Sequence, residues 1–228
     1  MHTFVKLCST PTIEHTGKRV FSESVVESAE LHWRESILTQ PHLWNGSMMS
    51  LAESRGHTLY TEEVDYLYWH FQWITGTNLG IRPIAVTGLL TLGGAVVLAC
   101  RGANVTQDAA RWELAPSGGL TPNDASTDKT PSLVNQLLIE AQEELNLDLA
   151  LFASPILLGL LRDSQTRIND FVFLCDLSIS SSDFTSLFAL RESQEYTDLK
   201  IVSWDEIRTA SWISETSRNI LRAVGPSC

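Results

Sequence analysis

The segment from Ile84 to Cys100 constrains the fold more than any other part of this chain. It reads IAVTGLLTLGGAVVLAC, which is almost entirely apolar and is interrupted in the middle by Gly93 and Gly94. A membrane-spanning helix needs about 20 apolar residues in one run. Two successive glycines readily adopt the positive φ angles of a tight hairpin turn. We therefore predict a buried β-hairpin here rather than a membrane segment.

Composition restricts the class of protein and the kind of partner. The 228 residues are 43% apolar and 19% charged, and their mean hydropathy is near zero, as is typical of a globular domain. Sixteen Lys and Arg stand against 27 Asp and Glu, which gives a net charge of −11. A chain this acidic lacks the charge attraction that binds nucleic-acid backbones, so we expect no nucleic-acid partner. An anionic substrate would have to be held by a few placed Arg residues or by metal ions.

The cysteines and the N-terminus indicate a reducing compartment. Cys8, Cys100, Cys175 and Cys228 form no CxxC pair, and their spacing does not suggest a disulfide framework. The first ten residues lack the basic and apolar regions of a signal peptide. We therefore expect a cytoplasmic protein.

Apolar periodicity and turn residues predict interleaved strands and helices. The helices are expected at 24–38, 132–145 and 211–223, the first with a capping box from Ser24 to Glu27. Such interleaving is typical of the α/β or α+β class. Besides the hairpin, strands are expected at 4–8, 47–51, 111–114, 156–161, 170–177 and 201–204, and 180–198 is expected to be irregular.

The N-terminal part of the chain is rich in aromatic and His side chains. All six His lie within residues 2–70, yet no two have the HxH, HxxxH or HExxH spacing of a metal site. The aromatic residues of 57–79 lack the accompanying basic residues of a nucleic-acid stacking surface. We interpret both sets as packing and surface residues.

The predicted helix LVNQLLIEAQEEL, residues 133–145, carries three carboxylates on one side. Glu140, Glu143 and Glu144 fall within about 100° of one another on a helical wheel. Like charges at i,i+4 repel, and a divalent cation would remove that repulsion. Carboxylate oxygens suit Mg²⁺ or Mn²⁺. The spacing alone favours a solvated acidic face over a metal site.

The segment before this helix favours the metal interpretation. Trp112 to Gly119, WELAPSGG, reads as a strand that runs into a Gly-Gly turn, where a backbone carbonyl can approach a metal. Strand, Gly-Gly turn and a helix with Glu-x-x-Glu-Glu resemble the Nudix box, G-x5-E-x7-R-E-U-x-E-E-x-G-U. Glu140 to Leu147, EAQEELNL, matches its second half, with Asn146 in place of the last Gly. The chain thus resembles the Nudix hydrolase family over roughly residues 80–225.

The first half of the box departs from the family pattern. Ile139 stands at the position of the family Arg, Pro131 at that of the other family Glu, and the loop is six residues longer. In the family, that Arg and Glu hold the loop against the helix. The longer loop here must find other anchors, and we expect Ile139 to pack in or beside the domain, next to loop 120–131.

The resemblance implies a fold, a reaction and a set of site residues. It implies a Nudix α/β/α sandwich with a mixed sheet over 81–228, and an N-terminal extension over 1–80. It also implies Mg²⁺- or Mn²⁺-dependent cleavage of a nucleoside diphosphate linked to another group, such as a UDP-sugar or ADP-ribose. By resemblance, metal would be held by Gly118, Glu140, Glu143 and Glu144. A further carboxylate would come from Glu195, or else Glu192, and phosphate contacts from Arg101 and Arg111.

Two other interpretations stay open. The lost Arg and Glu would permit a non-catalytic Nudix-fold binding module, and the aromatic N-terminal segment would permit a protein that only binds partners. Residues 1–80 are few for an independent core. We expect them to dock on the core through Trp33, Trp44, Trp69 and Trp73, as a wall of the cleft or a homodimer contact.

Overall fold

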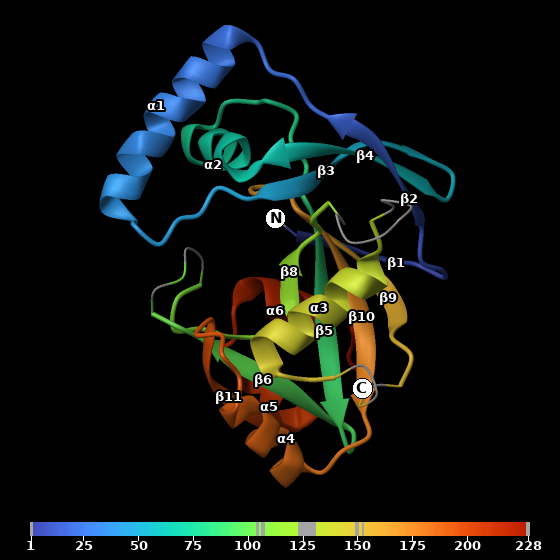
Figure 1. Ribbon diagram of the computed structural model, residues 1–228. Helices are drawn as coiled ribbons and strands as arrows, with labels where there is room; N and C mark the ends of the chain where they lie inside the picture. The colour runs from blue at the N-terminus through green and yellow to red at the C-terminus, as the bar shows by residue number, and fades with distance from the viewer. Residues whose placement is uncertain are drawn as a thin grey trace.

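The computed structural model describes residues 2–103, 105, 108–122, 131–148, 151 and 153–226. Most of loop 120–131 and Cys228 lie outside the described residues. Figure 1 shows an N-terminal unit above a larger sheet whose two faces carry helices. The strands are β1 (His2–Lys6), β2 (Thr12–Lys18), β3 (Ser47–Arg55), β4 (Thr58–Asp65), β5 (Ile84–Leu92), β6 (Ala95–Arg101), β7 (Trp112–Glu113), β8 (Ser117–Gly119), β9 (Ile156–Asp163), β10 (Asn169–Leu177) and β11 (Tyr196–Val202). The helices are α1 (Glu23–Thr39), α2 (Tyr66–Thr75), α3 (Leu133–Leu145), α4 (Ser181–Ala189), α5 (Trp204–Thr209) and α6 (Glu215–Val224).

The main sheet is mixed. Over the described residues its strand order is β1-β9-β10-β5-β6-β11, and β10 runs parallel to β5 while the other pairs are antiparallel. The predicted hairpin is confirmed as β5 and β6, and Gly93 and Gly94 take φ angles of 58° and 82° in its turn. No helix among the described residues is long and apolar enough to cross a membrane.

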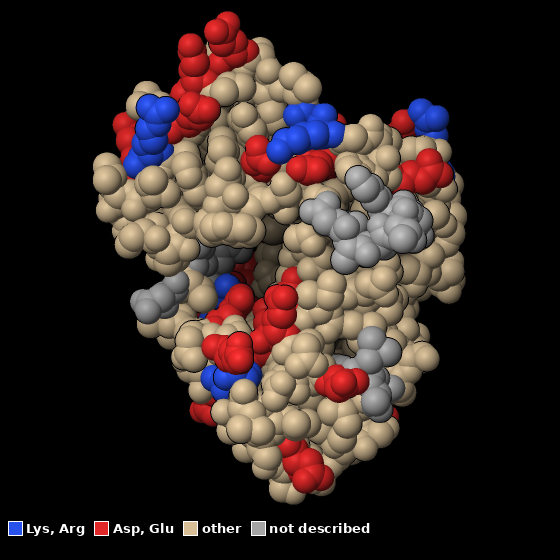
Figure 2. All heavy atoms as spheres, viewed as in Figure 1, with Lys and Arg blue, Asp and Glu red and all other residues tan. Residues whose placement is uncertain are grey.

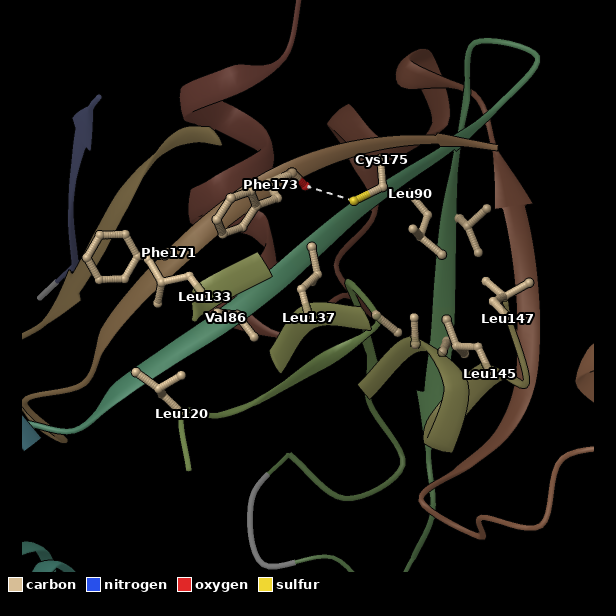
Figure 3. Packing of buried hydrophobic residues seen from close by; sticks show 14 of the residues in the cluster. Val86, Leu90, Leu120, Leu133, Leu137, Leu145, Leu147, Phe171, Phe173 and Cys175 are labelled. Atoms are coloured by element: carbon tan, nitrogen blue, oxygen red, sulfur yellow. Dashed lines mark hydrogen bonds between the residues drawn. The ribbon is translucent and has the colours of Figure 1, made fainter. Parts of the chain in front are cut away.

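The two faces of the sheet bury separate apolar clusters, as a strand buried on both faces requires. Val86 and Leu90 of β5 face α3 and pack with Leu137 (Figure 3). Leu89 of β5 faces the opposite side and packs with Ile220 of α6. Helices cover both faces, so the predicted α/β/α arrangement with a mixed sheet is confirmed.

The N-terminal segment is tied to the main sheet at several points. Its first strand, β1, is an edge strand of that sheet beside β9. Strands β2, β4 and β3 form a second sheet, and Met49 of β3 donates its backbone N–H to the carbonyl of Leu120 at 2.8 Å. The Trp69 indole of α2 donates to the carbonyl of Thr166 at 2.9 Å. The two parts therefore share hydrogen bonds as well as apolar contacts.

The Trp residues of the N-terminal extension differ in burial: some pack against neighbouring aromatic rings, and one is exposed. Trp69 is 3% exposed and stacks on Trp73, and Trp33 lies edge-on to Tyr66. Trp44, which we expected to dock, is 80% exposed. Its indole lies against the backbone of Gly46 at the cleft described below.

Several predicted local features were wrong. Helix α1 begins after Ser22 rather than with a capping box at Ser24, and Ser22 makes no side-chain cap. Residues 181–189 form helix α4, because the Ser180 hydroxyl caps it by accepting from the Asp183 N–H, and Phe184 and Phe188 bury one face. The C-terminal helix begins only at Glu215, after the cap residue Ser214. The predicted helix at 132–145 is confirmed, with a Ser132 cap and left-handed Asn146.

Candidate active site

A cleft opens where the main sheet divides. Strands β5 and β6 pair only near their turn, and further along β5 pairs with β8 while β6 pairs with β7. The resulting cleft has a volume of about 580 Å³. Met48, Tyr66 and Trp69 of the N-terminal unit line its opposite wall. Figure 2 shows the hollow between the two parts of the molecule, with acidic side chains at its lower edge.

Glu140 reaches the cleft from α3 and lies against β8. Its carboxylate is so close to the Cα of Gly118 that a side chain at position 118 would collide with it. The Gln136 side-chain amide donates to Glu140 at 2.8 Å. Burial raises the pKa of Glu140 to about 7; the Gln136 hydrogen bond opposes this rise, while the charges of Glu143 and Glu195 add to it.

Glu144, one turn further along α3, is almost completely buried. It is 2% exposed, and its Oε2 accepts a hydrogen bond from the backbone N–H of Ser117 at 3.0 Å. Its other oxygen, Oε1, is buried without a hydrogen-bond partner among the described residues. Burial, followed by the charges of Glu195 and Glu140, raises the pKa of Glu144 well above its usual value. Within the described part of the chain, no positive group lowers the pKa of this carboxylate.

Glu195 lies beside these two carboxylates and is held by Arg101. The Arg101 guanidinium contacts Glu195 at 3.2 Å and Glu113 of β7 at 2.7 Å. The Tyr196 hydroxyl donates to the same Glu113 oxygen at 2.8 Å and lies 3.2 Å from the Ser117 hydroxyl. Burial disfavours the charged form of Arg101, but Glu113 outweighs it and raises the Arg101 pKa.

Glu113, Ser117 and Tyr196 are site residues that the sequence interpretation missed. Glu113 stands in the quoted strand WELAPSGG, and Tyr196 follows the candidate Glu195. Both residues lie in segments that resemble the Nudix pattern, and this position in the sequence is the signal that could have identified them as site residues. Their spacing along the sequence gives no indication that Glu113 of β7 and Tyr196 of β11 form a hydrogen bond.

The hydrogen bonds between β8 and β5 show that the backbone N–H and C=O groups of Gly118 and Gly119 point in opposite directions. Pro116 and Leu120 bond to Gly88 and Ile84 of β5, whereas the Ser117 N–H is turned to Glu144. Because backbone groups alternate along an antiparallel strand, the Gly118 groups face β5 and those of Gly119 face the α3 side. The carbonyl of Gly119 therefore points to the side of the carboxylates. Gly118 has a different role, because its missing side chain leaves room for Glu140.

Other expected residues lie further out. Glu143 is exposed, although it is near enough to Glu140 to influence that pKa. Glu192 is exposed and does not line the cleft. Arg111 is exposed and donates to the carbonyl of Ser211 at 3.5 Å. Ile139 is 45% exposed, and most of the loop expected beside it lies outside the described residues.

The donor set fits a hard divalent cation. Among the described residues, no group of three or more His, Cys, Asp and Glu side chains is arranged so that it could hold a metal ion by itself. The unpartnered Oε1 of Glu144 and the mutual repulsion of Glu140, Glu144 and Glu195 are what a cation would relieve. All the available ligands are oxygen atoms, which suit Mg²⁺ or Mn²⁺.

Comparisons with known proteins found similarity in three-dimensional structure but not in sequence. No family model and no curated protein matches the chain in sequence. DR0079 from Deinococcus radiodurans matches with a TM-score of 0.52 at 10% identity, over 79% of this chain and 100% of that one. The MutT protein from Methanosarcina mazei Go1 matches with a TM-score of 0.47 at 19% identity, over 62% and 91%. A Nudix hydrolase from Nitrosomonas europaea matches with a TM-score of 0.45 at 16% identity, over 62% and 86%.

At these identities the likeness concerns the fold. The mixed sheet between helices and the order of β8, a loop and the carboxylate-bearing α3 agree with what the resemblance in sequence implied. In fold, the chain is therefore similar to DR0079, and a Nudix hydrolase is among its weaker matches.

Proposed function

We propose that this protein is a metal-dependent hydrolase that cleaves the diphosphate of a nucleoside diphosphate linked to another group. The products would be a nucleoside monophosphate and a phosphorylated second product, and a nucleotide-sugar such as a UDP-sugar, or ADP-ribose, is the favoured substrate class. The observation that carries this proposal is that Glu140 and Glu195 line one cleft and that their charges act on the buried Glu144 next to them.

The metal would be held by Glu140, Glu143 and Glu144 together with a backbone carbonyl of Gly118 or Gly119 in β8. The direction of the β8 backbone favours the Gly119 carbonyl over that of Gly118. When bound, Mg²⁺ or Mn²⁺ would neutralise diphosphate charge and make a bound water more acidic. Glu143 is exposed, so it would contribute from the open side of the cleft.

Glu195 is our candidate for the group that accepts the proton of the attacking water. It is 37% exposed at its side chain and is oriented by Arg101, which is itself anchored to Glu113. Because Arg101 already serves two carboxylates, its role in this proposal is to position Glu195 rather than to bind phosphate alone. Arg111, outside the cleft, would reach only a group that extends toward Ser211.

The aromatic wall of the cleft supports an organic group beside the diphosphate. Tyr66 and Trp69 line the side opposite the carboxylates, and Trp44 stands exposed next to them. Pockets with apolar walls and few polar groups are usual for small organic ligands. This arrangement supports a base or sugar on the N-terminal side and the diphosphate near α3.

A metal-supplemented turnover screen tests the proposal. Purified protein would be assayed with Mg²⁺ or Mn²⁺ against UDP-sugars, ADP-ribose and dinucleoside diphosphates, with phosphorylated products detected by chromatography. Glu140→Gln and Glu144→Gln should each lower turnover by about 100-fold or more, because each removes a charged ligand. Glu192→Gln, outside the cleft, is the matched control. Metal-dependent binding without turnover of any compound would favour the non-catalytic binding module instead.

A further inference from the structure

The cleft contains a further buried carboxylate, on the opposite face of the sheet from α3. Asp170 of β10 lines the cleft and is 7% exposed. Its Oδ2 accepts a hydrogen bond from the Thr87 hydroxyl of β5 at 2.8 Å. Its Oδ1 is buried and has no hydrogen-bond partner among the described residues.

The strand alternation separates this carboxylate from the proposed metal ligands. Val172, two residues after Asp170, and Leu89, two residues after Thr87, both belong to the apolar cluster that packs on α6. Asp170 and Thr87 therefore face the cleft from the α6 side, whereas Glu140 reaches it from the α3 side. The cleft therefore contains acidic side chains on two sides, and their surroundings differ.

An ionised oxygen buried without a partner is costly, and a ligand that donates a hydrogen bond removes that cost. Thr87 satisfies one Asp170 oxygen and fixes the direction of the other. Burial raises the pKa of Asp170 to about 6; Thr87 opposes this and the charge of Glu113 adds to it. At neutral pH the group is thus mostly an acceptor.

The surroundings decide what kind of donor fits. Glu113 and Asp163 also line the cleft, and the charge of Glu113 acts on Asp170, so a phosphate beside Asp170 would be repelled. The neighbouring walls include Leu161 and Ile220, which offer apolar contact. A sugar ring combines a partly apolar face with neutral hydroxyl donors, and it meets both conditions.

We propose that Asp170, oriented by Thr87, is a specificity-determining residue that accepts a hydrogen bond from a sugar hydroxyl of the substrate. This inference rests on the proposed function, because it places the sugar of a nucleoside diphosphate derivative in the cleft. The hydroxyl belongs either to the group linked to the diphosphate or to the nucleoside's own ribose. Both sources share the same recognition chemistry.

Direct binding to the intact chain separates this inference from the proposed reaction. Isothermal titration calorimetry in Mg²⁺ would compare UDP-glucose with UDP, and ADP-ribose with ADP, for the linked sugar. It would compare UDP with 2′-deoxy-UDP, and ADP with 2′-deoxy-ADP, for the nucleoside ribose. The wild-type protein should prefer the hydroxyl-bearing member of at least one pair by about tenfold or more, as expected for a hydrogen bond to a charged group.

Two variants and one control locate that preference. Asp170→Asn should reduce the preference about tenfold, and Thr87→Val, which frees the carboxylate, should reduce it by a smaller factor. Asp176→Asn is the matched control, because Asp176 of β10 accepts from Thr91 of β5 at 2.9 Å at an exposed place outside the cleft. It should bind like the wild type.

The possible failures differ in what they overturn. A wild-type preference that survives in Asp170→Asn and Thr87→Val overturns the role of Asp170 and leaves the proposed function standing. Wild-type binding without any preference among the pairs does the same. Absence of binding to every compound, together with no turnover in the metal screen, overturns both. If Asp170→Asn fails to fold, the Thr87→Val comparison alone decides the inference.

Discussion

The Glu140 carboxylate lies directly against the Cα of Gly118, and no side chain would fit between them. Gly118 belongs to β8 and Glu140 to α3, so this contact sets how closely the helix approaches the strand. The neighbouring Gly119 has open space where its Cβ would be. Two adjacent glycines thus differ in what a methyl group would do.

We predict that Gly118→Ala displaces Glu140 and that Gly119→Ala does not. A methyl group at position 118 must push the carboxylate or the helix aside, which typically costs about 1–3 kcal/mol. Urea unfolding should show that loss for Gly118→Ala and a change within about 0.5 kcal/mol for Gly119→Ala. Metal-dependent turnover should fall in the former. Equal stability and turnover of the two variants would contradict the contact.

We predict that Arg101→Met is strongly destabilising, because it leaves Glu113 buried without its ion-pair partner. Breaking a buried pair in this way costs about 3–5 kcal/mol. The double variant Arg101→Met, Glu113→Gln should recover part of the loss in a double-mutant cycle. Arg111→Met is the control, since Arg111 is exposed and outside the cleft. Equal unfolding free energies for Arg101→Met and Arg111→Met would refute this prediction.

Asp170 should make the stability depend on pH. Its pKa is raised from 3.8 to about 6 in the folded protein, so the folded state binds the proton more tightly than the unfolded chain. The stabilisation that comes from protonated Asp170 is fully present below about pH 3.8 and is lost as the pH rises through about 6. This changes the free energy of unfolding by about 3 kcal/mol. Urea unfolding of Asp170→Asn between pH 4 and 7 should show a shallower decline than the wild type. Asp176→Asn should keep the wild-type slope, and identical slopes for all three proteins would count against the burial of an ionisable Asp170.

Trp69 should hold the N-terminal unit to the main sheet through its indole N–H. Trp69→Phe keeps one aromatic ring but removes the donor to Thr166 and part of a buried indole, which should cost at least about 1 kcal/mol in the free energy of unfolding. Trp44→Phe should change it by less than about 0.5 kcal/mol, because Trp44 is 80% exposed. Chemical denaturation measures both. The prediction fails if Trp44→Phe is as damaging as Trp69→Phe.

Local sequence signals determined the elements that depend on neighbouring residues alone. The Gly93–Gly94 hairpin and helix α3, with its Ser132 cap and left-handed Asn146, were predictable because turn and cap chemistry acts over a few positions. Phe184 and Phe188 of α4 carried the spacing of one helical face, but the Ser-rich surroundings concealed it. Strand β1 was expected as a strand, yet its place beside β9 could not be read from its five residues.

The sequence by itself thus determined the carboxylates of α3 and the class of chemistry they suit. The glycine pair before them was expected to form a turn, but it lies in strand β8. Only the tertiary structure decided that Glu144 is buried and Glu143 exposed, that Arg101 is bound to Glu113 and Glu195, and that Asp170 shares their cleft. The physical reason is that helix periodicity sets which residues share one side of a helix. The charge balance of a site instead depends on strands far apart in the chain, which meet only when the sheet forms and divides between β5 and β6.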